Sequence, residues 1–116
     1  MRKLFLHSTP TSLLHFDEDS LMYVQADGNY VTLYFRDSST KVLTMQLNEF
    51  EKLLKRKAAN RFSRVGRSLI VNNRYVFFIN LTKQEIVISD KMLFTHTLTA
   101  SKKAVEDLKI NIENKG

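Results

Sequence analysis

Segments in which apolar residues alternate with other side chains constrain the fold of this 116-residue chain more than any other feature. In residues 30–36, Val31, Leu33 and Phe35 occupy every second position. Successive side chains of a β-strand point to opposite faces, so this spacing predicts a strand with one buried face. The chain is therefore predicted to be mainly β.

Turn residues divide the predicted strands into two groups. The first group is separated by the turn signals 26–29 and 37–39, and comprises 21–25, 30–36 and 40–44. The second group is rich in β-branched and aromatic residues and predicts a three-stranded meander over 75–80, 85–89 and 94–99. Residues 3–7 are a further candidate strand.

Two stretches have helical spacing instead. Leu47, Phe50, Leu53 and Leu54 predict one amphipathic helix in the middle of the chain, over about 46–57. A short C-terminal helix is expected to begin at Ser101, a favourable N-cap residue, with its apolar stripe on Val105, Leu108 and Ile112. We expect a single domain over 1–116, with its core at about 15–112, an N-terminal extension over 1–14 and a connector at 8–12.

Composition excludes several kinds of site. The chain has no cysteine, hence no disulfide, thiolate metal site or cysteine nucleophile. His7, His15 and His96 have no ligand-like spacing, and His96 is expected to be a structural histidine. No phosphate-binding glycine motif occurs. We therefore expect no enzymatic activity, no metal and no cofactor. Without a signal peptide or an apolar run of membrane-spanning length, we expect a cytoplasmic protein.

The positive charge is unevenly distributed along the chain. The net charge is +6, and nine Lys or Arg but no acid lie between Glu51 and Glu85. Such a stretch repels itself unless an anion lies nearby, and nucleic-acid phosphate is the commonest anionic partner. A membrane surface is the alternative, but it is normally bound by a basic amphipathic helix with a broad apolar face. Arginines 61, 64, 67 and 74 alternate with apolar residues instead, which favours nucleic acid.

Three blocks of sequence carry a resemblance to a known family. Residues 62–75 read FSRVGRSLIVNNRY, and they follow the predicted strand pair MYVQADGNYVTLYFRD at 22–37. Together with Ser101-Lys102-Lys103, these blocks resemble the LytTR-type DNA-binding domain of bacterial transcription regulators over about 15–112. The positions that match the family's arginine-rich run are Phe62, Arg64, Arg67, Ser68, Val71 and Asn72. Gly66 departs from the pattern, because the family usually has histidine there.

The resemblance implies small antiparallel sheets in a β-β-β arrangement, with loops that face double-stranded DNA in place of a recognition helix. Loops that carry Asn29 and Tyr30, and Lys102 and Lys103, would enter successive major grooves. The segment with Arg64, Arg67 and Ser68 would lie across the phosphate backbone between them. The implied partner is promoter DNA with repeated half-sites bound in tandem, and whether a homodimer binds them stays open.

Other interpretations of the same residues stay open. Arg64 and Arg67 are also typical of a solvated surface, Tyr30 of cross-strand packing, and Asn72-Asn73 of a turn. Lys55–Lys57 fits a helix C-terminus, and residues 17–19 (Asp-Glu-Asp) fit a solvated turn or the cap of a short helical turn. Phe62, Val65, Leu69 and Val71 are expected in the core.

Two alternative functions follow from these residues. The chain could act as a regulatory module that pairs with a related regulator without binding DNA itself. An RNA-binding domain is less favoured, because the aromatic surface-strand motif of RNA-recognition domains does not occur.

Overall fold

A computed structural model describes residues 2–58 and 60–115. The described residues form ten strands, two α-helices and two short 3-10 turns. The strands are β1 (Lys3–Thr9), β2 (Ser12–Asp17), β3 (Leu21–Asp27), β4 (Tyr30–Phe35), β5 (Thr40–Thr44), β6 (Phe62–Val65), β7 (Leu69–Asn72), β8 (Val76–Asn80), β9 (Glu85–Ser89) and β10 (Thr95–Thr99). The helices are α1 (Leu47–Ala58) and α2 (Lys102–Lys115), and the 3-10 turns are η1 (Glu18–Ser20) and η2 (Asn73–Tyr75).

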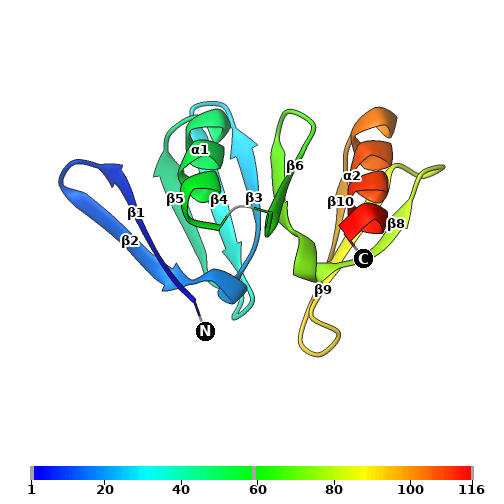
Figure 1. The fold of residues 1–116 in the computed structure, drawn as a ribbon, viewed down its shortest axis with the longest axis horizontal. Coiled ribbons are helices and arrows are strands. Elements are labelled where there is room, and N and C mark those ends of the chain that lie inside the picture. The colour runs from blue at the N-terminus through cyan, green and yellow to red at the C-terminus, as the bar shows by residue number, and fades with distance from the viewer. Residues whose placement is uncertain (1, 59, 116) are drawn as a thin grey trace.

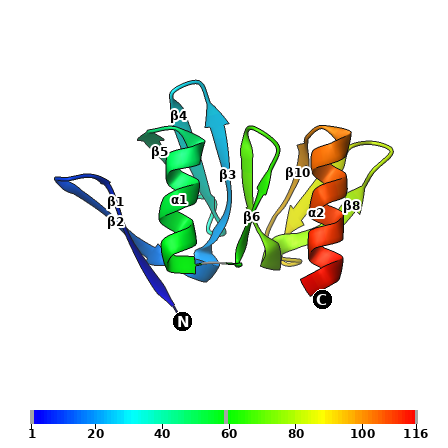
Figure 2. The same cartoon turned by 45° about the horizontal axis from the view of Figure 1, so that its top comes forward.

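The strands form three antiparallel sheets that follow one another along the longest axis of the molecule (Figure 1). The hairpin β1–β2 lies at one end. A central five-stranded sheet has the order β5-β4-β3-β7-β6, and a three-stranded sheet with the order β10-β9-β8 lies at the other end. Figure 2 shows α1 in front of the central sheet and α2 beside β6 and β8. The small antiparallel sheets and the two helices confirm the predicted fold class.

The central sheet separates two hydrophobic clusters. On one side, α1 and the β1–β2 hairpin cover residues such as Val24 and Ile70. On the other side, α2 and the three-stranded sheet cover residues such as Tyr23 and Val71. Strands β3 and β7 therefore contribute to both clusters, and all four residues of β7 are buried. These two strands separate the two hydrophobic clusters and pack against both of them.

The two helices follow from their sequences. Helix α1 buries Phe50 completely, along with Leu47 and Leu54 at helical spacing. Helix α2 begins where Ser101 Oγ accepts a hydrogen bond from the Ala104 amide at 3.2 Å. This side-chain cap confirms Ser101 as the N-cap. Neither helix in the described part of the chain is long and apolar enough to cross a membrane.

The structure differs from the sequence-based expectations in two places along the strands. Segments 62–65 and 69–72 form the hairpin β6–β7, which the alternation did not indicate because Leu69–Asn72 is buried on both faces. Near the N-terminus, segment 12–17 is a strand that pairs with β1, with Leu6 opposite Leu14. Leu4 and Leu6 lie in the core, so the segment expected to be an extension contributes to packing.

The acidic run 17–19 lies at the start of a short helical turn, with Asp17 at its N-cap position, which agrees with one of the two interpretations of this run; the other, a solvated turn, does not hold for Glu18. Glu18 is only 2% exposed and lies in the 3-10 turn η1. Its carboxylate is 3.4 Å from the Nε atoms of both Arg2 and Arg61. A buried carboxylate requires compensating charge, and these two arginines supply it.

Candidate nucleic-acid interface

Four chain segments converge along one edge of the molecule, at the top of Figures 1 and 2. These are the β3–β4 turn, the start of α1, the β6–β7 turn and the start of α2. We call this surface the turn edge, and it comprises residues 27–30, 46–48, 66–68 and 101–103. The edge runs along the longest axis of the molecule (Figure 1).

Contacts between the segments hold the turn edge together. Gln46 Nε2 donates to Asn29 Oδ1 at 3.2 Å, which connects α1 to the β3–β4 turn. The amide of Ala26 donates to the carbonyl of Ser68 at 2.8 Å, which connects β3 to the β6–β7 turn. A hollow of about 340 Å³ lies between these segments, lined by Ala26, Gly28, Gln46, Leu47, Asn48, Arg64, Arg67 and Ser68. The edge is therefore a connected surface assembled from residues far apart in the sequence.

Six of the seven residues predicted to contact DNA are exposed on this edge. They are Asn29, Tyr30, Arg67, Ser68, Lys102 and Lys103. Tyr30 is 51% exposed at the start of β4, which leaves much of its ring outside the cross-strand packing. Lys103 is 82% exposed and lies 3.5 Å from Asp107 one turn along α2, an exposed pair that contributes little to stability. The fold thus brings the predicted residues of three sequence blocks onto one surface.

Arg64, the seventh residue, is placed differently. Its side chain is 24% exposed and its guanidinium has protein partners on every nitrogen. Nε donates to Gly66 O at 2.9 Å, and Nη2 donates to Arg67 O at 3.0 Å. Nη1 donates to Asn48 Oδ1 at 2.6 Å and to Glu51 Oε1 at 3.0 Å. Direct DNA contact by Arg64 stays a prediction, while its bonds within the protein are a feature of the fold.

The fold supplies acids to several cations of the acid-free stretch, so the expected self-repulsion is partly relieved within the protein. Arg61 pairs with Glu18, and Arg74 Nη1 lies 3.1 Å from Asp19 Oδ2. Arg64 and Lys55 both pair with Glu51. Within the described residues Arg67 has no ion pair. Its charge on the turn edge is therefore available to an external anion.

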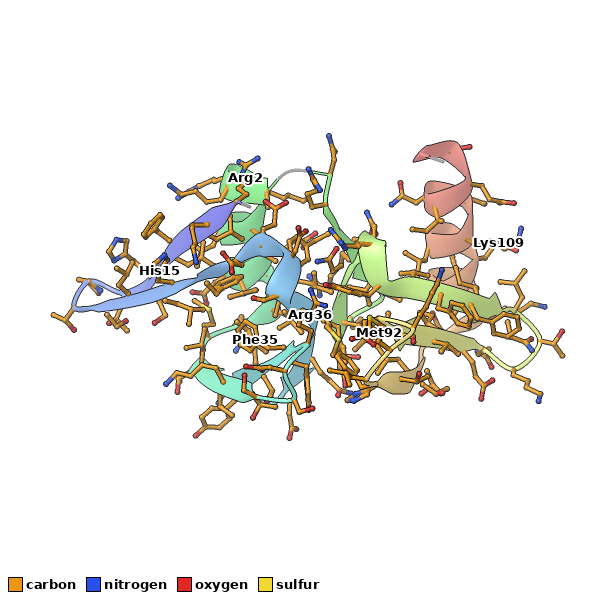
Figure 3. All side chains as sticks on the ribbon, turned by 90° about the horizontal axis from the view of Figure 1, so that it is seen from below. Arg2, His15, Phe35, Arg36, Met92 and Lys109 are labelled. Atoms are coloured by element: carbon orange, nitrogen blue, oxygen red, sulfur yellow. The ribbon has the colours of Figure 1, made fainter. Side chains whose placement is uncertain are left out.

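Much of this pairing lies away from the turn edge. Figure 3 views the molecule from below, from the side opposite the turn edge, and shows Arg2 beside the end of α1. There Arg2 Nη2 donates to the carbonyl of Lys57, and a cation at this position is favoured by the helix dipole. Arg2, Arg61 and Arg74 therefore have partners within the protein, and their positions are explained without nucleic acid.

Asn72 is buried and has a structural role. It is 3% exposed, its Nδ2 donates to Leu21 O at 2.8 Å, and its Oδ1 accepts from the Arg74 amide at 3.1 Å. The bond to Leu21 ties β7 to the start of β3. The bond to Arg74 caps the turn η2, in agreement with the interpretation of Asn72-Asn73 as a turn.

His96 lies between the central and three-stranded sheets, away from the turn edge. Its Nδ1 is 2.7 Å from the Tyr23 hydroxyl, and the Tyr23 ring stacks on Tyr34 at 4.4 Å. Burial, with a smaller contribution from Tyr34, raises the pKa of Tyr23 to about 12. The Tyr23 hydroxyl therefore stays protonated in more alkaline solution than an ordinary tyrosine does. His96 contributes a packing and hydrogen-bonding contact between two sheets, which is the structural part expected of it.

Comparison with known proteins agrees with the fold described above. The profile of the LytTr DNA-binding domain matches residues 12–113. Among solved structures, the LytTr DNA-binding domain of a protein from Bacillus cereus, described as a methyl-accepting/DNA response regulator, has the same fold. The TM-score is 0.66 at 21% identity, over 95% of this chain and 95% of that one. Curated protein sequences gave no significant match. Because the profile covers most of its length, the chain belongs to the LytTr DNA-binding domain family.

Proposed function

We propose that this chain is the DNA-binding part of a cytoplasmic transcription regulator and that it recognises specific double-stranded DNA through the turn edge. The observation that carries the proposal is that exposed amide, hydroxyl and cationic side chains belong to separate segments, and that these segments meet along one edge of the ribbon (Figure 1). Arg67, Lys102 and Lys103 are assigned to phosphate or guanine. Asn29, Tyr30 and Ser68 are assigned to base edges and the adjoining backbone. Phosphate contacts position a protein on DNA, and contacts to base edges specify the sequence.

The molecule as a whole is longer than the spacing between successive major grooves. Its longest extent is 44 Å, and successive major grooves on one face of a duplex are about 34–36 Å apart. The 44 Å include the β1–β2 hairpin, which lies beyond the β3–β4 turn at one end of the molecule (Figure 1), so contact of the turn edge with two grooves is part of the proposal. In this arrangement the β3–β4 turn enters one groove and the start of α2 approaches the next. The β6–β7 turn lies against the backbone between them.

We predict a moderate salt dependence of DNA binding. Arg67, Lys102 and Lys103 are the exposed cations assigned to DNA, and neutralising roughly three phosphates gives a slope of about −3 in log K against log salt. A chain whose arginines were all free for phosphate would give a steeper slope, but Arg61 and Arg74 already pair with acids. Affinity for one fragment, selected from a random DNA pool and measured over a range of salt, tests this. A slope near zero contradicts the electrostatic assignment.

We predict that Arg67→Ala weakens binding to all DNA sequences by a similar factor and lowers the magnitude of the salt slope by about 1, as expected for loss of one phosphate contact. Thermal stability should change little, because Arg67 is exposed and has no ion pair within the described residues. The matched control is Arg56→Ala, which removes an exposed arginine at the far end of α1. Equal losses in the two variants would show that only net charge matters.

The same binding measurements separate this proposal from the alternative of a module that only pairs with a related regulator. DNA recognition requires a saturable complex whose affinity depends on sequence. A protein that binds a related regulator, but shows no sequence-dependent complex with selected DNA, would support the pairing function instead.

A further inference from the structure

We propose that Arg64 acts as a positioning residue that holds the β6–β7 turn in the conformation that presents Arg67 and Ser68, and that it does not contact DNA itself. This inference rests on the proposed function and assigns a different role to one residue of the candidate site. It also gives a role in DNA binding to Glu51 and Asn48 on α1, neither of which carries a positive charge.

The bonds of Arg64 join the turn to α1. Two nitrogens of the guanidinium donate to the carbonyls of Gly66 and Arg67, both of which belong to the turn. The third nitrogen donates to the side chains of Asn48 and Glu51 on α1. A guanidinium is a rigid planar fork, so it fixes the carbonyls relative to the helix in a way that a single point charge does not.

The turn is held on its other side by α2. Gly66 has a φ of +63°, a left-handed conformation that glycine adopts without strain. A Cβ atom at Gly66 would lie 3.4 Å from the Cβ of Ala104, so the turn lies directly against the first turn of α2. The turn that carries Arg67 is therefore fixed between the two helices whose N-termini lie on the turn edge.

The electrostatics of Arg64 also favour a role within the protein. Its charge is balanced by Glu51, and the two side chains are 24% and 22% exposed. Four of the five guanidinium N–H groups of Arg64 donate within the protein, so a bidentate contact to phosphate would cost at least one of these bonds. Arg67 has no ion pair among the described residues to lose. The two roles predict opposite effects for Glu51. If Arg64 contacts phosphate, removing the acid beside it strengthens DNA binding, and if Arg64 positions the turn, removing its anchor weakens binding.

The first test is therefore Glu51→Ala, with Glu49→Ala as the matched control. Glu49 is an exposed acid in the first turn of the same helix and has no ion pair within the described residues. We expect Glu51→Ala to weaken binding to the selected DNA about fivefold to tenfold, about the effect of losing one typical hydrogen bond. Glu49→Ala should leave binding unchanged or slightly stronger. Stronger binding by Glu51→Ala, equal to or beyond that of the control, would overturn the proposal.

The second test is Arg64→Lys, which keeps the charge and removes the fork. We expect about tenfold weaker binding with the salt slope unchanged, because no phosphate contact is lost. Arg67→Lys, which preserves a point charge at a phosphate, should bind within about twofold of the unsubstituted protein. Wild-type affinity in Arg64→Lys, or a slope reduced by about 1 in Arg64→Ala, would show that Arg64 contacts phosphate directly.

A third measurement needs no DNA. NMR order parameters of the backbone amides of residues 66–68 in the free protein should fall in Arg64→Lys and in Glu51→Ala, and stay unchanged in Glu49→Ala. Unchanged order parameters in all three variants would show that Arg64 does not fix the turn. If the unsubstituted protein formed no saturable DNA complex, the proposed function would fail, while this measurement would still decide whether Arg64 orders the turn.

Discussion

Replacing Lys102 and Lys103 together with glutamate is expected to abolish sequence-specific DNA binding. Both lysines are exposed in the first turn of α2, on the turn edge. The change converts two cations into two anions at a helix N-terminus that we assign to a groove, and like charges across a nucleic-acid interface repel strongly. Footprinting on the selected DNA fragment measures the effect. Protection of the same bases at comparable protein concentration would show that α2 does not face DNA.

Stability is expected to change little in this variant. Acids are favoured over lysines at a helix N-terminus by about 0.3–1 kcal/mol each. Against this gain, the variant loses the pair between Lys103 and Asp107 and places a glutamate near that aspartate. The matched control replaces Arg56 and Lys57 with glutamate, which changes the net charge equally at the far end of α1. A comparable loss of binding in the control would show that the change in net charge alone explains the effect.

Phe50→Ala is expected to produce the largest loss of stability among single substitutions in α1. Phe50 is fully buried, and removing a buried phenylalanine ring costs about 3–5 kcal/mol through lost burial and the cavity that remains. Because α1 also carries Asn48 and Glu51, loosening of this helix should weaken DNA binding as well. The free energy of unfolding from urea titration measures the first effect.

Phe78→Ala provides the control for this prediction. Phe78 lies on β8 and is 51% exposed, so its truncation removes a ring of the same size from a partly solvated site. We expect a loss of no more than about 1 kcal/mol, in the range of surface substitutions. If both variants lost similar stability, packing of Phe50 against the central sheet would not be a main support of the fold.

The sequence was informative for several strands that have one exposed face. Residues 40–44 were predicted as a strand and form β5 with the same bounds, because Leu43 is buried and its neighbours are exposed. Strand β7 did not show this signal, since Leu69–Asn72 is buried on both sides between α1 and the three-stranded sheet. A short apolar run without alternation does not distinguish a buried strand from other buried segments.

At the candidate site, the exposed residues could be predicted from the sequence but the ion-pair partners of the arginines could not. The resemblance indicated the exposed residues of the turn edge, and the fold brings them together. The partners of the arginines could not be predicted, because Arg61 meets Glu18 and Arg74 meets Asp19 only after the chain has folded. Absence of acids from one stretch of sequence says little about which charges remain free in the structure. The sequence does not indicate that Arg64 pairs with Glu51 while Arg67 has no ion pair within the described residues.

The length of the molecule has a consequence for the arrangement of binding sites on a promoter. A body 44 Å long, laid along a duplex, occupies more than one helical turn of about 34–36 Å. Two copies in the same orientation on one face of the DNA would therefore overlap if their half-sites were one turn apart. Direct repeats read from one face must then be separated by about two turns, or about 20–21 base pairs between centres. Closer repeats that are not one whole turn apart would place the second copy on a different face of the duplex.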